Sequence, residues 1–474
     1  MEKARIILGY CPTRRDVFDV NIAIAYGKRI KEYIKQFDVE LVDLEGINQE
    51  SLLFEDRDIL PVIERFRKEK VDALFFPHCN FGSENRVAQV AKALGVPVLL
   101  WGPRDEAPDP TTGMRSRDTQ CGLFATGKIL RRHNVKFTYL TNTPLESDYF
   151  KEKFQKFLSV VSVVKAMKGL NILQISTRPE PFGTVMCNEG ELLEKFNIHI
   201  YPVAIPDVTF EMGRLLTENP EELLQTVAYV KNNISPSAKE ADIRKISALK
   251  LTMKNLAKKY RCRAVAVQCW TALQEVTHIV PCLANALLTD EGIPVVCETD
   301  IHGAITAVMT QAATQNTQPQ FFADLTVRHP EEENTELLWH CGNFPYSLAK
   351  DKENAYAGTY WINPSDKFGT CMWQIRNGEV TIARFDGDHG EYSLFIGEAE
   401  AVDGPYNGGC YTWIKTKDWP RWEHKLVCGP YIHHISGVYG SYADVLAEAC
   451  KYIGNVTPDP SDSSEGELSA RWIR

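Results

Sequence analysis

The sequence predicts an α/β protein: two doubly wound parallel-sheet domains, followed by an antiparallel, β-barrel-like C-terminal domain. Three observations predict this fold. Short apolar runs alternate with amphipathic segments through roughly the first 100 residues, and the alternation resumes near residue 169. After about residue 350, short segments rich in Thr, Tyr, Trp and Val alternate with turn residues. The predicted domains are therefore 1–168, 169–348 and 349–474.

The first domain reads as a βαβα series, which indicates a parallel sheet with helices on both faces. The expected strands are residues 4–10, 39–44, 73–76 and 96–101, and the expected helices are 19–37, 59–70 and 86–94. Loops at the carboxyl ends of parallel strands form the ligand crevice of such folds. We therefore expect binding residues in the loops 11–16, 78–84 and 102–118.

The second domain repeats this pattern, and the third departs from it. Expected strands of the second are 171–175, 198–202, 264–268 and 294–298, and expected helices are 188–195, 220–259 with a break at 233–236, and 279–288. Expected strands of the third are 358–362, 370–375, 380–386 and 410–415, followed by a helix at 442–453. Asn377-Gly378 is a hairpin signal. Residues 457–467, rich in Pro, Ser, Asp and Gly, are expected to form a loose arm.

Composition excludes several classes of protein. The net charge is 53 − 62 = −9, which argues against a general binder of nucleic acid or of membrane surfaces. The chain starts without a signal-peptide pattern and has no apolar run long enough for a membrane helix, so we expect a soluble cytoplasmic protein. No Gly-x-Gly-x-x-Gly follows the first strand, which disfavours a nucleotide-dependent oxidoreductase. None of the thirteen cysteines forms a Cys-x-x-Cys pair, and we expect them to be reduced, small buried residues.

Three potential metal ligands each end an apolar run. Glu298 follows 293–297, Asp324 follows 321–323, and His340 follows 337–339. Two carboxylates and an imidazole suit Mn²⁺, Mg²⁺, Co²⁺ or Fe²⁺ better than a sulfur-seeking metal. The adjacent pair His433-His434 offers further imidazole nitrogens. The alternative for each acidic residue is a helix cap or solvated loop, and for each histidine a packed ring.

These groups match the requirements of aldose–ketose isomerisation through an enediol. A metal that chelates O1 and O2 lowers the cost of the charge developing there. A carboxylate moves a proton between C1 and C2. On spacing alone, this constellation only suggests a metal-dependent sugar isomerase, with Mn²⁺, or Mg²⁺ or Co²⁺, as cofactor.

The motifs Cys-Glu298-Thr-Asp and Phe-Ala-Asp324, with a late histidine before Gly-x-Tyr-Gly and a helix, resemble the L-fucose and L-arabinose isomerase superfamily. The resemblance implies that Glu298 and Asp324 bind Mn²⁺ and also act as the proton-transferring bases. His340 resembles an additional histidine of the arabinose branch. His433 best matches the late metal histidine, and a shift of one residue would select His434. The resemblance further implies a homo-oligomer, a hexamer, whose sites are completed by a neighbouring subunit.

The loop Cys11-Pro-Thr-Arg14-Arg15-Asp16 resembles the arginine-bearing loop that a neighbouring subunit lends in this superfamily. Guanidinium groups grip carboxylate, phosphate or sulfonate oxygens in fork geometry. The candidate substrate-binding residues are Arg14, Arg15, Asn80, Trp101, Arg104 and Arg115, with Arg117 as a further cation and Trp270 as a stacking platform. An anionic sugar such as sulfoquinovose is therefore a substrate alternative to L-fucose or L-arabinose. The other interpretation of these arginines is a solvated surface.

Two other functions remain open at this point. One is another metal-dependent sugar enzyme, an epimerase or a lyase, on the same scaffold. The other is a sugar-binding protein without catalysis, because two α/β domains around a crevice also describe sugar receptors. A receptor has no need of paired carboxylates with late histidines, which favours the isomerase.

Overall fold

The structure, a computed structural model, describes residues 1–359 and 367–461. It divides into two compact units, one formed by Ala4–Lys165 and the other by residues 166–461 together with Met1–Lys3. The predicted boundary between residues 348 and 349 lies inside the second unit and stays a prediction. Every helix in the described ranges is too short or too polar to cross a membrane.

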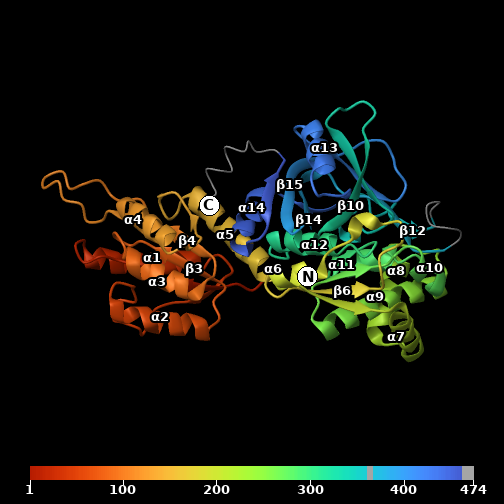
Figure 1. Cartoon of the computed structure of the whole chain (residues 1–474), viewed down its shortest axis with the longest axis horizontal. Coiled ribbons are helices and arrows are strands. Elements are labelled where there is room, and N and C mark those ends of the chain that lie inside the picture. The colour runs from red at the N-terminus through yellow and green to blue at the C-terminus, as the bar shows by residue number, and fades with distance from the viewer. Residues whose placement is uncertain (360–366, 462–474) are drawn as a thin grey trace. The chain divides into compact units, whose positions relative to one another are not determined.

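The Ala4–Lys165 unit is a doubly wound sheet (Figure 1). Its five parallel strands lie in the order β2-β1-β3-β4-β5. They are β1 Ile7–Tyr10, β2 Glu40–Val42, β3 Ala73–Pro77, β4 Val98–Trp101 and β5 Thr138–Tyr139. The helices are α1 Val20–Ile34, α2 Asp56–Lys68, α3 Glu84–Leu94, α4 Thr119–Arg132 and α5 Asp148–Met167. One apolar core packs under α1 and α5 and another under α2, α3 and α4, so both faces of the sheet are covered, as predicted.

The second unit begins with a four-stranded parallel sheet in the order β7-β6-β8-β9. Its strands are β6 Asn171–Ile175, β7 His199–Val203, β8 Ala264–Val267 and β9 Val295–Val296. The helices around it are α6 Glu189–Phe196, α7 Ile205–Glu218, α8 Glu221–Asn233, α9 Glu240–Tyr260, α10 Ala272–Thr277 and α11 Cys282–Asp290. The long helical stretch breaks between α8 and α9, close to the predicted break.

The larger sheet of this unit has nine strands and is mixed. Its order is β12-β13-β16-β11-β10-β17-β14-β15-β18, and β15 also pairs with β16. The strands are β10 Phe321–Arg328, β11 Thr335–His340, β12 Tyr356–Gly358, β13 Thr370–Gln374, β14 Gly378–Asp388, β15 Glu391–Val402, β16 Cys410–Lys415, β17 His434–Tyr439 and β18 Thr457–Pro460. The pairs β13–β16 and β15–β18 are parallel, so the predicted all-antiparallel sheet is wrong. Closure into a barrel stays a prediction.

Helix α12, Ile301–Ala313, packs against strands of both sheets of the second unit and is buried along its whole length (Figure 1). It contains no Asp, Glu, Lys or Arg. The hydroxyls of Thr306 and Thr310 bond back to carbonyls of the preceding turn, which satisfies them inside the core. Two further helices, α13 Trp419–Cys428 and α14 Ala443–Ile453, flank the large sheet.

Two local predictions need correction. Asn377-Gly378 is not a hairpin turn, because β13 pairs with β12 and β16 rather than with β14. The hairpin that forms joins β14 to β15 through His389-Gly390, which have φ of 49° and 82°. Such paired positive φ angles belong to the tight two-residue turn that matches strand twist. Residues 457–460 of the predicted arm form β18 instead, and 462–467 lie outside the described residues, as does part of the expected strand 358–362.

Candidate active site

Glu298 lies just beyond β9, at the carboxyl end of the parallel sheet. Glu298 and Thr299 both have left-handed backbone conformations, with φ of 54° and 59°. This conformation costs a residue with a side chain about 1–2 kcal/mol. Strain of this kind gathers at functional sites, so the turn marks Glu298 as a site residue. Its Oε1 accepts a hydrogen bond from Cys269 Sγ at 3.2 Å.

Asp324 and His434 face Glu298 from the large sheet. They lie opposite each other on the antiparallel strands β10 and β17, so their side chains share one face. His434 Nε2 is 3.5 Å from Asp324 Oδ1 and 3.8 Å from Glu298 Oε2. His340, the last residue of β11, places its Nε2 3.8 Å from the same Glu298 oxygen. The structure thus brings together four residues that the sequence separates by up to 136 positions (434 − 298).

The atoms that converge here lack partners. Glu298 Oε2, Asp324 Oδ1 and His340 Nε2 are all buried without a hydrogen-bond partner among the described residues. Burying such polar atoms unpaired is costly, which indicates that a ligand completes them. Two carboxylate oxygens and imidazole nitrogens form a donor set suited to Mn²⁺, Mg²⁺ or Co²⁺. The residues present therefore fit the cation that the sequence predicted.

The adjacent histidines differ in their surroundings. His434 is buried, whereas His433 is exposed and packs edge-on against it with ring centroids 4.4 Å apart. Ligand atoms of Asp324, His433 and His434 all lie within 4.8 Å of one another, so either histidine can share a cation with Asp324. His434 also reaches Glu298. The geometry therefore favours His434, although the alignment of motifs favoured His433.

A buried network holds His434 from behind. Asp300 Oδ2 accepts a hydrogen bond from His434 Nδ1 at 2.9 Å, which leaves Nε2 as the ring nitrogen that faces the two carboxylates. Arg384 on β14 binds both Asp300 oxygens, and its Nε donates to Asp386 Oδ2 at 2.8 Å. Asp386 Oδ1 in turn lies 2.7 Å from His302 Nδ1. The sequence reading did not identify this network as part of the site.

Asp300 also caps helix α12. Its Oδ1 accepts a hydrogen bond from the Gly303 backbone N–H at 2.8 Å. A Cβ atom at residue 303 would lie 2.5 Å from Asp300 Oδ2, so only glycine leaves room for the carboxylate there. An acidic residue directly before an apolar helix, with glycine three positions on, is the sequence signal that could have identified Asp300 as a buried cap.

Neighbouring charges set the protonation of the site. Burial alone raises the pKa of Glu298, but His340 and His434 outweigh burial and hold that pKa below its usual value. Burial also raises the pKa of Asp300, and Arg384 and His434 together lower it far below its ordinary range. A hydrogen bond from Cys282 is the largest influence that lowers the pKa of Cys341 to about 6. Glu298 and Asp300 are therefore ionised at neutral pH, so Glu298 can bind a cation and Asp300 can hold His434.

The arginines expected to bind an anionic group lie in the Ala4–Lys165 unit, and most of them already have acidic partners. Arg14 is buried and pairs with Asp16 and Glu50. Arg15 pairs with Glu84. An ion pair of this kind must be broken or shared before the guanidinium can bind a substrate anion.

Two further arginines of this unit, Arg115 and Arg117, also have acidic partners. A third, Arg104, is exposed. Arg115 lies 3.2 Å from Asp118, and the buried Arg117 donates to Glu106 at 2.9 Å. The roles of all these arginines in substrate binding stay predictions.

The remaining candidates have mainly structural contacts. Asn80 accepts a hydrogen bond from the Arg15 backbone N–H at 2.9 Å and so braces the 11–16 loop. Trp101 is completely buried in the core of its unit. Trp270 is half-buried beyond β8, and its ring packs edge-on against Phe182 with centroids 5.9 Å apart. Of the candidate aromatic residues, Trp270 is thus the one that retains exposed surface for a sugar.

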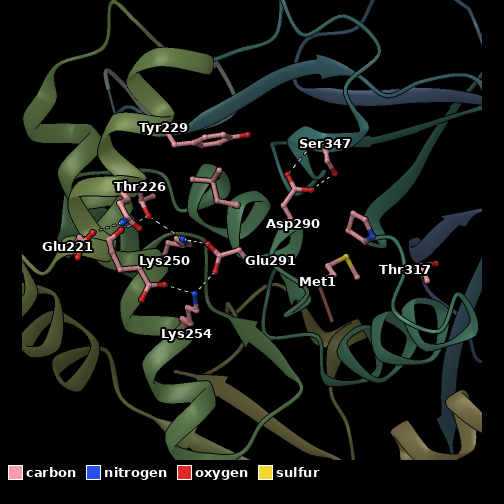
Figure 2. Close-up of a pocket in the computed structure, with 14 residues that line it drawn as sticks. Met1, Glu221, Thr226, Tyr229, Lys250, Lys254, Asp290, Glu291, Thr317 and Ser347 are labelled. Carbon is pink, nitrogen blue, oxygen red and sulfur yellow. Dashed lines mark hydrogen bonds and ion pairs between the residues drawn. The ribbon is translucent and has the colours of Figure 1, made fainter. Parts of the chain in front are cut away.

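A separate surface pocket of the second unit does not have the features of a metal or sugar site (Figure 2). Lys250 and Lys254 line it, and both point toward Glu291 with ion pairs; Lys254 also pairs with Glu222. The pocket is lined by none of the four converging residues described above. Its two lysines are already paired with acidic residues, so the cluster at Glu298 remains the candidate active site.

Comparison with known proteins shows which enzymes this chain resembles. Residues 9–168 match the family model of the fucose/sulfoquinovose isomerase N-terminal domain, and residues 338–457 match that of the L-fucose isomerase C-terminal domain. A sulfoquinovose isomerase of Priestia aryabhattai is 25% identical over 443 residues, which are 93% of this chain and 96% of that protein. A sulfoquinovose isomerase of Alkalicoccus urumqiensis is 25% identical over 406 residues, 84% of this chain and 87% of that protein.

Solved structures add little. A periplasmic solute-binding protein of Actinobacillus succinogenes with bound D-allose aligns over 66% of this chain and 92% of its own chain, at 14% identity. The TM-score of this alignment is 0.17, which is too low to indicate a shared fold. The two family models and the near full-length relatives agree with the resemblance seen in the motifs. The chain belongs to the fucose/sulfoquinovose isomerase family and is a sugar isomerase.

Proposed function

We propose that this isomerase converts an anionic aldose, sulfoquinovose, to the corresponding ketose with the help of a divalent cation. The observation that carries the proposal is the convergence of Glu298, Asp324 and His434 with buried, unpartnered oxygens. The substrate is inferred from relatives named sulfoquinovose isomerase that align over most of this chain.

The two carboxylates have the roles of proton carriers and cation ligands. Glu298 and Asp324 approach His434 Nε2 from different sheets, so a sugar bound between them meets one carboxylate from each side. Glu298 is ionised and buried, which makes it a competent base toward a proton on the carbon next to the carbonyl. A bound divalent cation supplies Lewis-acid stabilisation of the negative charge that develops on O1 and O2. His434, held by Asp300, presents a fixed nitrogen donor to that cation.

The donor set supports Mn²⁺ as the cation, with Mg²⁺ or Co²⁺ as substitutes, because it combines carboxylate oxygens with imidazole nitrogens and contains no thiolate. The hexamer with sites shared between subunits, and the cytoplasmic location, stay predictions; light scattering of the purified protein measures the former.

The test is a panel of aldoses incubated with the Mn²⁺-loaded protein and followed by NMR. The panel contains sulfoquinovose, L-fucose, L-arabinose and D-arabinose. We expect a ketose from sulfoquinovose. Formation of a C2 epimer or of cleavage products instead supports the epimerase or lyase alternative, and binding without conversion supports a sugar-binding protein.

A further inference from the structure

The loop that follows β6 reaches the candidate active site. The hydroxyl of Thr299, next to Glu298, donates to the carbonyl of Thr177 at 3.2 Å. Arg178 is the next residue of that loop. Because β6, β8 and β9 are parallel neighbours, the residues after their carboxyl ends share one edge of the sheet. Arg178 therefore lies at the same edge as Glu298.

The Arg178 guanidinium has no acidic partner among the described residues. Its Nη1 donates to the backbone carbonyls of Pro179, at 3.3 Å, and Glu180, at 3.0 Å, and these are neutral groups of its own loop. Its side chain is partly exposed. The charge is thus held in place by the loop yet not neutralised, unlike that of Arg14 or Arg15.

The same loop also carries an aromatic ring to the edge of the site. Phe182 packs edge-on against Trp270, which directly follows Cys269, the residue whose thiol donates to Glu298. Arg178 and the half-buried Trp270 ring lie on one rim of the site, and the carboxylates of Glu298 and Asp324 lie beyond them. The arginine suits a charged group at one end of a sugar, and the indole suits the face of its ring. Without a positively charged side chain beside it, the anionic group of such a sugar would be repelled by the carboxylates of the cluster.

We propose that Arg178 is the residue that binds the anionic group of the substrate and so determines specificity for a charged sugar. This inference rests on the proposed function. It replaces the arginines of the Ala4–Lys165 unit as the principal anion contact, and it requires no second subunit.

The experiment compares steady-state kinetics of Mn²⁺-loaded wild type, Arg178→Gln and Arg178→Lys with sulfoquinovose. We expect Arg178→Gln to raise KM about 10- to 100-fold with kcat changed less than about threefold, because a charge-assisted hydrogen bond to the substrate is lost. Arg178→Lys keeps the charge without the fork and should recover part of the loss. Arg214→Gln, the same substitution on the exposed face of α7, is the matched control and should leave both constants unchanged.

The outcomes separate this inference from the proposed function. If wild type does not convert sulfoquinovose, the proposed function itself is wrong. If wild type converts it and Arg178→Gln has an unchanged KM, the inference is wrong while the proposed function stands. A KM increase in Arg104→Gln with none in Arg178→Gln would return the anion contact to the first unit. A fall in kcat alone, equal in the Gln and Lys variants, would show a merely structural role for Arg178.

Discussion

Replacing Asp300 by Asn tests how the buried network supports the cation site. Asp300 makes a bidentate contact with Arg384, accepts from His434 Nδ1 at 2.9 Å and accepts from the Gly303 N–H at 2.8 Å. Asparagine has one acceptor oxygen for these three donors, and its amide group would face a donor. His434 is then free to carry its proton on Nε2, where it no longer binds a cation.

The expected losses of Mn²⁺ affinity and of folding stability follow from comparable sites in other proteins. Loss of the group that orients a metal-binding histidine weakens metal binding about 10- to 100-fold, or about 1.4–2.8 kcal/mol. Breaking a buried ion pair costs up to about 3–5 kcal/mol of folding stability, and less here because Asp386 still pairs with Arg384. We therefore expect Asp300→Asn to bind Mn²⁺ 10- to 100-fold more weakly and to unfold at lower temperature.

The assay is titration of metal-free protein with Mn²⁺, followed by electron paramagnetic resonance of the unbound ion. Asp386→Asn is the matched control, because it removes the same charge from Arg384 but does not touch His434. We expect it to lower stability and leave Mn²⁺ affinity within about threefold of wild type. The reasoning is refuted if Asp300→Asn binds Mn²⁺ normally, or if Asp386→Asn weakens binding equally.

Three further predictions concern single side chains. Glu298→Gln should abolish isomerisation and keep the far-UV circular dichroism of wild type, because it removes charge and little volume. His434→Gln should reduce Mn²⁺ affinity by at least 10-fold, whereas His433→Gln should change it less than threefold, since His434 reaches both carboxylates. Burial raises the pKa of Glu336 to about 7, so its ionisation destabilises the folded state as pH rises above the ordinary value of 4.5. Glu336→Gln should raise the free energy of unfolding by about 3 kcal/mol at pH 8 and by less than 1 kcal/mol at pH 5.

Each of these has a contradicting result. Measurable turnover by Glu298→Gln above about 10% of wild type would remove Glu298 from the chemistry. An equal loss of Mn²⁺ affinity in His434→Gln and His433→Gln would contradict the assignment of His434 as the main histidine ligand. Denaturant unfolding of Glu336→Gln and of Glu333→Gln, an exposed acid on the adjoining turn, measures the pH effect; a similar gain in both variants would mean that burial is not its cause.

The first half of the fold follows from local pattern. Parallel strands buried on both faces form continuous apolar runs, and residues 73–76 show this so clearly that the observed strand differs by one residue. Pairing between distant strands has no such local signature. The turn signal at Asn377-Gly378 therefore misled, because what pairs with β14 is decided by the whole sheet.

In the candidate site too, the residues with a local sequence signal were predicted, and those that depend on distant contacts were not. Glu298, Asp324 and His340 each end an apolar run, which identified them before their proximity was known. The assignment of Asp324 to a central domain hid the fact that β10 pairs with β17 of the large sheet. Asp300 and Arg384 were missed because their role depends on contacts between a helix start and a strand 84 positions later (384 − 300).

The most direct test of the account uses protein stripped of metal and incubated with sulfoquinovose in D₂O, with and without added Mn²⁺. The account predicts no ketose without metal. With Mn²⁺ it predicts a ketose that carries deuterium at C1, because the proton that a carboxylate takes from C2 exchanges with D₂O before a proton returns to C1. Full conversion by verified metal-free protein would contradict the role of the cluster formed by Glu298, Asp324 and His434.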